Sequence, residues 1–578
     1  MDRRSLLKRP FTTKKGNSTS KEIVAGNNPK TADSPLENKH FNTQLPNMAR
    51  SMAGLEAYTG VFGEEQAGHL LRRCLFGTRR TEVTEAAERG LQKTIELLFA
   101  EQAKPTPPIN SQYGDDPNVP IGETWVTAPI TQGINGVRRA SLQRWWMGLM
   151  LNQGISLREK MTLFWHNHFA VEATTVGEAK SGYYYLDLLR THALGNFKTL
   201  AEEITINPAM LRYLNGNQNV RNAPNENYAR EVLELFTIGK GALVGGGDYT
   251  YYTEEDVVEA AKVLTGWRDR LNTDSGIPTP YFTVNRHTLG SKQFSHRFDN
   301  QIIEENGENE YKDLINMIFN KRQVARHISE KLYRWFVYYV IDEAAYANVI
   351  EPMADMLIAN EFEVAPVLEA LLKSEHFFDV INYGVIIKNP IDFLGGVVKN
   401  FDMVFPTLEG DNLLTNYKLW AILVGASGQL QMNIMNPPSV AGWIAYYQSP
   451  QYYQSWISSV TLPQRIEFVQ RMIRTGYARD GFRVVARPLE FVSQIELADD
   501  PNELVRELVR ILFPKELTDE QYVYLKEVLI PGLPDYEWTI EYNEYLASPD
   551  NQALATAIYT KLRTLLETMV ALAEYQLS

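Results

Sequence analysis

The chain has 578 residues, of which 44% are hydrophobic and 22% charged, as in globular proteins large enough to bury a sizeable core. Its formal net charge of −13 argues against a nucleic-acid-binding protein, because such proteins present a basic face. The single cysteine, Cys74, excludes an internal disulfide framework and a multi-cysteine metal site, and its apolar neighbours predict that it is buried.

The first 55 residues are rich in Lys, Asn, Ser, Thr and Pro, and this composition predicts a disordered basic and polar tail. Arg3 and Arg4 resemble the start of a twin-arginine export signal, but Arg9 and Pro10 follow where an apolar segment is required. The sequence therefore predicts a cytoplasmic protein by default, and a periplasmic or cell-envelope protein if this start is functional. No apolar run approaches the roughly 20 residues of a membrane helix.

Helical spacing of apolar residues dominates from residue 64 onward. It predicts a helical core over 64–270, a second helical part over 301–480 and an acidic helical C-terminal part over 485–578. Residues 271–300 form an irregular insertion, in which Tyr281–Val284 is expected to be one strand of a small hairpin. The predicted fold class is therefore mainly α, a large multi-helix globular domain with a small irregular or β-hairpin insertion near 270–300.

The segment 156–169 carries two of the nine histidines, His166 and His168, among aromatic residues. Ser156 and Glu159 have the spacing of a capping box, which predicts a helix start. Histidines two apart on a straight helix point about 200° away from each other, so they share one metal only if the helix ends or distorts at Asn167. Each histidine is a candidate general base or metal ligand, and the alternative is a histidine satisfied within the core.

A second polar segment begins at Asn225, which is expected to cap a helix that ends at Gly239. Glu231 and Glu234 share one face of this helix. If that face meets the histidines, it predicts proton transfer by His166, His168 and Glu231, and a divalent-metal site of His166, His168, Glu226 and Glu234. The alternative is an exposed face with a surface ion pair of Arg230.

Two further sets are candidate binding residues. His287 and Lys292 lie in a glycine-containing loop that could contact an anion. Trp443 and Tyr447 belong to an aromatic stretch that suits sugar stacking or protein contacts, and the alternative is packing within the core. The chain lacks the His-Glu-x-x-His metalloprotease motif, the Gly-x-Ser-x-Gly nucleophile elbow and the phosphate-binding Walker A loop.

An ordered set of motifs resembles the bacterial domain-of-unknown-function family 1800 over about residues 64–576. The matching segments are Leu70–Gly77, Leu157–Phe169, His192–Phe197, Pro208–Leu211, Asn225–Glu231, Glu234–Gly239, Tyr252–Val257 and Leu264–Trp267. The resemblance implies a large, mainly helical domain, often encoded beside a second family that resembles the alkaline-phosphatase/sulfatase superfamily and frequently carries twin-arginine signals. The chain departs from the family's His-Asp-x-Gly-x-Lys pattern, because Thr288 follows His287.

Two functional hypotheses follow. In the first, the protein is a non-catalytic binding or scaffold component that acts with a phosphatase/sulfatase-like envelope partner or a surface polysaccharide. In the second, it is a metal-assisted hydrolase with a His/Glu site. The sequence leaves both open.

Overall fold

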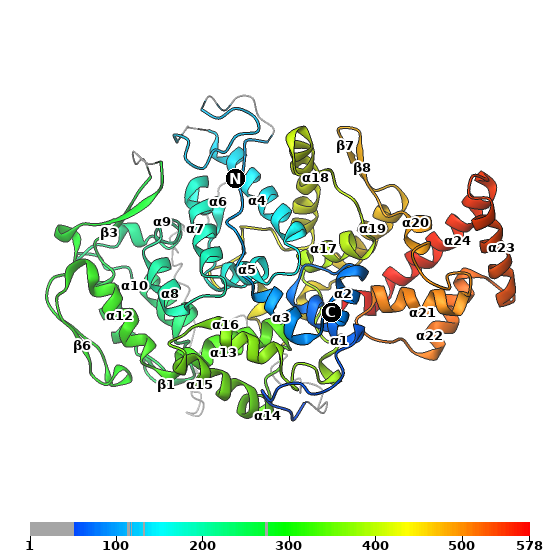
Figure 1. The fold of residues 1–578 in the computed structure, drawn as a ribbon. Helices are drawn as coiled ribbons and strands as arrows, with labels where there is room; N and C mark the ends of the chain where they lie inside the picture. The colour runs from blue at the N-terminus through cyan, green and yellow to red at the C-terminus, as the bar shows by residue number, and fades with distance from the viewer. Residues whose placement is uncertain (1–50, 112–115, 117, 131–132, 272–275) are drawn as a thin grey trace, which may run out of the picture. The chain divides into compact units, whose positions relative to one another are not determined.

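The computed structural model describes residues 51–111, 116, 118–130, 133–271 and 276–578 (Figure 1). The twin-arginine start and residues 1–50 of the predicted tail lie outside this described part. Residues Ala49–Ser578 form one compact unit by their contacts. The finer division of the helical part into three segments stays a prediction.

The first half of the fold is built mainly from helices. These are α1 (Glu64–Cys74), α2 (Arg80–Arg89), α3 (Leu91–Phe99), α4 (Asn135–Asn152), α5 (Arg158–His168), α6 (Ala173–Val176), α7 (Ala179–Thr191), α8 (Phe197–Thr205), α9 (Pro208–Tyr213), η2 (Gly216–Gln218), α10 (Glu226–Glu231), the π-helical η3 (Val232–Thr237) and α11 (Glu254–Val263).

The second half is also mainly helical, and with the first half it confirms the mainly α fold class. Its helices are η4 (Val284–Arg286), η5 (His296–Phe298), η6 (Gly307–Asn309), α12 (Glu310–Phe319), α13 (Arg322–Phe336), α14 (Glu343–Ala345), η7 (Tyr346–Ile350), α15 (Glu351–Ala359), α16 (Val364–Leu372), η8 (Val380–Asn382), α17 (Pro390–Asn400), α18 (Gly410–Gln429), η9 (Ile444–Tyr446), η10 (Tyr452–Trp456), α19 (Thr461–Arg474), α20 (Pro488–Val492), α21 (Pro501–Leu512), α22 (Asp519–Leu529), α23 (Asp535–Ala547), α24 (Gln552–Ala571) and η11 (Ala573–Gln576). No helix in the described part of the chain is long and apolar enough to cross a membrane.

The strands within the described residues form small antiparallel pairs. They are β1 (Leu243–Gly245) with β2 (Asp248–Tyr249), β3 (Trp267–Arg270) with β4 (Thr279–Phe282), β5 (Lys292–Gln293) with β6 (Ile302–Ile303), and β7 (Tyr477–Arg479) with β8 (Phe482–Val484).

The predicted hairpin is confirmed in kind but begins and ends earlier than expected. Its second strand is Thr279–Phe282, and Val284 already starts the turn η4. Trp267 stands opposite Phe282 in the register, and their ring centroids lie 5.5 Å apart. Cross-strand aromatic pairs of this kind stabilise a hairpin, so this contact fixes where the strand ends.

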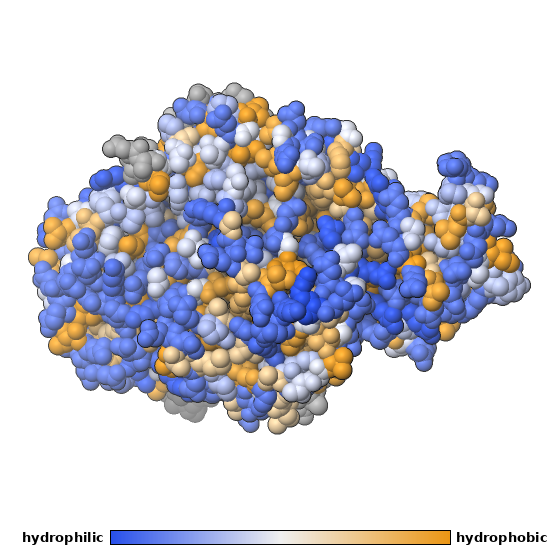
Figure 2. All heavy atoms as spheres, in the orientation of Figure 1, coloured by the Kyte–Doolittle hydropathy of each residue, from blue (hydrophilic) through white to orange (hydrophobic). Residues whose placement is uncertain are grey.

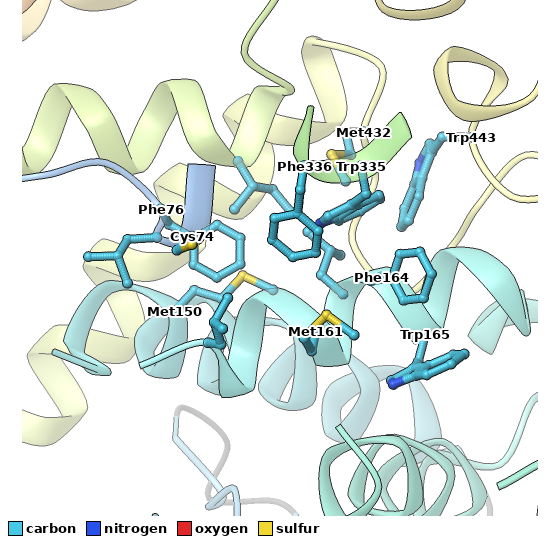
Figure 3. Packing of buried hydrophobic residues seen from close by; sticks show 14 of the residues in the cluster. Cys74, Phe76, Met150, Met161, Phe164, Trp165, Trp335, Phe336, Met432 and Trp443 are labelled. Atoms are coloured by element: carbon cyan, nitrogen blue, oxygen red, sulfur yellow. The ribbon is translucent and has the colours of Figure 1, made fainter. Parts of the chain in front are cut away.

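Helix α5 lies in the middle of the core, and its side chains are buried all the way round (Figures 1 and 3). Phe164 of α5 packs against Trp335 of α13, with ring centroids 5.5 Å apart. Trp443, from the loop before η9, covers the same region (Figure 3). Cys74 is buried within the cluster, as its neighbours predict.

The predicted capping box at the start of α5 is wrong. The helix begins at Arg158 and its N-cap is Leu157, whose side chain makes no capping bond. The carboxylate of Glu159 instead accepts hydrogen bonds from Arg190 and from the indole of Trp146. The local pattern is overridden because the start of α5 is buried, and a buried carboxylate needs a cation more than a backbone donor. The predicted cap at Asn225 is confirmed. Thr253 caps α11 in the same way, by accepting from a backbone N–H three residues later.

Candidate functional site

His166 is fully buried in a cage of aromatic rings. Its Nδ1 lies 2.8 Å from the hydroxyl of Tyr185, which in turn donates to the carbonyl of Phe169 at 2.8 Å. Because the Tyr185 hydroxyl donates its proton to Phe169, Nδ1 of His166 carries a hydrogen and donates it to the hydroxyl oxygen. Burial lowers the pKa of His166 to about 3, so the ring is neutral near pH 7. Its Nε2 has no hydrogen-bond partner among the described residues.

His168 faces a different part of the core. Its Nε2 lies 3.0 Å from the carbonyl of Phe236, which only accepts, so Nε2 carries the hydrogen. Its Nδ1 accepts a hydrogen bond of 3.0 Å from Nζ of Lys331, which also donates to the carbonyl of Leu235. Burial, then the charges of Lys331 and His327, hold the pKa of His168 well below its usual value.

The carbonyls that hold His168 and Lys331 belong to the π-helical turn η3. In this turn Ile238 and Gly239 both donate to the carbonyl of Leu233, which leaves the next carbonyls open to side chains. π-helical turns occur often at functional sites. Lys331, whose pKa burial lowers to about 7, is a site residue that sequence reasoning missed. Nothing in the local pattern of α13 distinguishes this lysine from its neighbours.

The carboxylates of α10 and η3 do not join the histidines. Glu226 is exposed. Glu234 accepts from Tyr252 at 2.8 Å and pairs with Lys240 at 3.2 Å. The expected surface pair of Arg230 exists, but its partner is Glu254 of α11, at 2.6 Å. Glu231 is half-buried, and burial followed by the charge of Glu234 raises its pKa to about 7.

The predicted metal ligands are not arranged as one ligand set. His166 and His168 leave a regular helix on different sides, and each has a separate hydrogen-bonding environment. Across the residues that the structure describes, no three His, Cys, Asp or Glu side chains are placed to hold a metal ion. The arrangement present does not fit a metal bound by the predicted residues.

Asn167 connects the histidine helix to the loop over 436–443. Its side-chain Oδ1 accepts from the backbone N–H of Trp443 at 2.9 Å. Gly442 has a φ of +90°, and a Cβ there would lie 2.5 Å from the carbonyl oxygen of Asn167. Only glycine fits this approach, which explains the Gly-Trp pair of this loop.

His287 and Lys292 are brought together, but inside the core rather than on a ligand-binding loop. The two side chains contact the same carboxylate, Glu310, at 2.9 Å from Nε2 of His287 and 2.6 Å from Nζ of Lys292. Their side chains are at most 1% exposed. Nδ1 of His287 lies 2.8 Å from the carbonyl of Thr265. This network ties the 271–300 insertion to α12, and Glu310 is the partner that sequence reasoning missed.

The aromatic stretch is mostly part of the core. Trp443, Tyr453 and Trp456 are buried, and Tyr446 stacks on Trp335 with ring centroids 4.4 Å apart. Tyr447, at 38% exposure, is the aromatic side chain of this stretch that faces solvent, and Ile444 beside it is also exposed. The buried rings of Trp443, Tyr453 and Trp456 are therefore not accessible for stacking on a sugar.

Replacing Glu231 with glutamine is expected to stabilise the fold by about 1–2 kcal/mol at pH 8 and by less at pH 5. Because the pKa of Glu231 is raised in the folded state, ionisation of this carboxyl group opposes folding. The free energy of unfolding is therefore highest below the pKa that Glu231 has in the unfolded chain, and it decreases as pH rises through about 7. Urea unfolding of both proteins at the two pH values measures this.

The matched control is Glu226→Gln, on the exposed first turn of the same helix. There a carboxylate favours the helix dipole, so its loss should cost a few tenths of a kcal/mol with little pH dependence. A Glu231→Gln gain that is equal at pH 5 and pH 8 would contradict the raised pKa.

A family model matches residues 69–577, nearly the whole chain. No curated protein and no solved structure matches it. The chain belongs to the family described as "Protein of unknown function (DUF1800)".

Proposed function

We propose that the protein is a non-catalytic binding component that acts with a protein of the phosphatase/sulfatase-like superfamily at the cell envelope. The observation that carries this proposal is the use of the motif histidines. The ring of His168 is bonded through both nitrogens, His166 is held by Tyr185, and both rings are neutral and buried. The network around His168 is satisfied at both ring nitrogens, and a satisfied buried network rigidifies the fold that presents a binding surface.

Exposed apolar side chains on the C-terminal helices supply a candidate surface for such a partner. Val523 of α22 is 64% exposed, and Tyr536 and Ile540 of α23 are 60% and 50% exposed. Figure 2 shows hydrophobic residues among hydrophilic ones over this end of the described chain. Apolar residues with a polar rim are typical of protein interaction sites.

The test mixes the purified chain with a phosphatase/sulfatase-like protein from the same organism and measures the mass of the complex by size-exclusion chromatography with light scattering. The wild-type chain should form a complex, and a variant with Val523→Ser, Tyr536→Ser and Ile540→Ser should weaken it at least tenfold. The control variant is Leu243→Ser with Val244→Ser, which removes equally exposed apolar residues from β1.

Absence of a complex with the wild-type chain would contradict the proposal. So would equal loss of binding in both variants, because the surface would then have no specific role. A complex that survives in His166→Ala while hydrolysis by the mixture is lost would favour the catalytic alternative instead.

A further inference from the structure

A cavity of about 320 Å³ lies between α1, α2 and the C-terminal end of α21, and no histidine lines it. Figure 1 shows these elements side by side. Its walls combine apolar side chains, among them Val83, Val509 and Phe513, with Arg72 and with the acidic residues Glu64, Glu65, Glu507 and Glu516. A volume near 300 Å³ with apolar walls and a few polar groups is typical of small-molecule sites.

Arg72 and Lys515 are the cations in this wall that have no carboxylate partner among the described residues. Arg79 pairs with Asp402 at 3.2 Å, and Arg80 and Arg510 both pair with Glu507. Arg72 donates one hydrogen bond, from Nη2 to the carbonyl of Arg510 at 3.1 Å.

The position of the Arg72 guanidinium is built into α1. A Cβ on Gly68 would lie 2.8 Å from Nη1 of Arg72, so glycine at this position lets the guanidinium fold back along the helix. Burial lowers the pKa of Arg72 to about 10, which is the effect expected when a cation is desolvated without a neighbouring anion.

Further cations stand behind Arg72. A smaller cavity shares Arg72 and Thr78 with the first and reaches Lys388 and Asp392. Asp392 is already paired, with Lys160 at 2.6 Å. Lys388 is 7% exposed and donates to the carbonyl of Tyr575 at 2.8 Å. Buried Arg465 donates to the carbonyl of Lys388. Arg72 is therefore the cation that reaches both cavities.

We propose that the cavity between α1, α2 and α21 binds an amphipathic small molecule whose carboxylate or phosphate group is held by Arg72. A guanidinium donates two parallel hydrogen bonds to either group. The apolar body of the ligand lies against Val83, Val509 and Phe513. This binding is separate from the proposed partner surface on α22 and α23 and does not depend on it.

The test is titration calorimetry of the full chain with octyl phosphate, octanoate and 1-octanol, which share one alkyl chain and differ in the head group. The anions should bind at least tenfold more tightly than the alcohol, and the order of octyl phosphate and octanoate identifies the preferred group. Arg72→Met should weaken anion binding by roughly tenfold to a hundredfold and leave the alcohol unchanged.

Two variants keep the test decisive. Arg506→Met removes an equally charged, 55% exposed side chain from α21 outside the cavity wall, and it should bind as the wild type does. Val83→Trp fills the cavity without a change of charge and should abolish binding of all three probes, which covers the case of an Arg72 variant that does not fold. Unchanged anion binding in folded Arg72→Met or in Val83→Trp, or no binding of either anion at millimolar concentration, would overturn the proposal.

Discussion

Replacing Arg190 with methionine is expected to lower the free energy of unfolding by about 3–5 kcal/mol. Nε and Nη2 of Arg190 lie 2.6 and 2.9 Å from the carboxylate of Glu159, and the two side chains are 2% and 5% exposed. Without the guanidinium, Glu159 would keep only the indole of Trp146 at 2.8 Å. A buried carboxylate with one neutral donor is strongly destabilising.

The double variant Arg190→Met with Glu159→Leu is the matched comparison, since it removes both charges and keeps apolar volume. It should unfold at a higher urea concentration than Arg190→Met alone, as followed by tryptophan fluorescence. If the single and double variants lose the same stability, the cost comes from lost packing of Arg190 over Trp145, and the buried-charge account is wrong.

The second large effect is expected for Glu310→Gln, which should also cost about 3–5 kcal/mol. Glu310 is fully buried and is the shared carboxylate of His287 and Lys292. Burial acts to raise its pKa, but hydrogen bonds from His287 and Lys292 outweigh this and hold the pKa below its usual value. A lowered carboxyl pKa stabilises the fold above the unfolded-state value, and this contribution disappears as pH falls through the folded-state value.

The loss should be concentrated in the 271–300 insertion, because the network joins that insertion to α12. Limited proteolysis at pH 7 is therefore expected to cut Glu310→Gln near this insertion while the rest of the chain stays protected. Glu308→Gln, an exposed change two residues earlier, should leave the proteolysis pattern unaltered. Protection of the insertion in Glu310→Gln equal to that in the wild type would refute the structural role of this carboxylate.

Features that depend on neighbours in the sequence could be predicted. Helical spacing predicts the mainly α fold, and Asn225 and Thr253 mark helix starts because a capping side chain bonds within three residues of itself. The hairpin near 270–300 was likewise predictable from its β-branched and aromatic residues. Its ends were not, because the Trp267–Phe282 contact fixes them across the loop.

The chemistry of the site depends on partners that are distant in the sequence. Lys331 is 163 residues from His168, and Arg190 is 31 residues from Glu159. No local pattern predicts either pair, so the sequence indicates a capping role for Glu159 and a metal-binding or general-base role for His168. The helical period does predict that His166 and His168 point apart, and the regular end of α5 at His168 accounts for their separate environments.

The π-helical turn η3 also has a consequence for the way the fold opens. The carbonyls of Leu235 and Phe236 are held by Lys331 of α13 and His168 of α5 instead of by the following turn of their own helix. The end of η3 therefore cannot fray alone, because fraying would leave His168 and Lys331 without these two hydrogen-bond acceptors. Local unfolding here has to release three segments together, which makes them one cooperative unit assembled from distant parts of the chain.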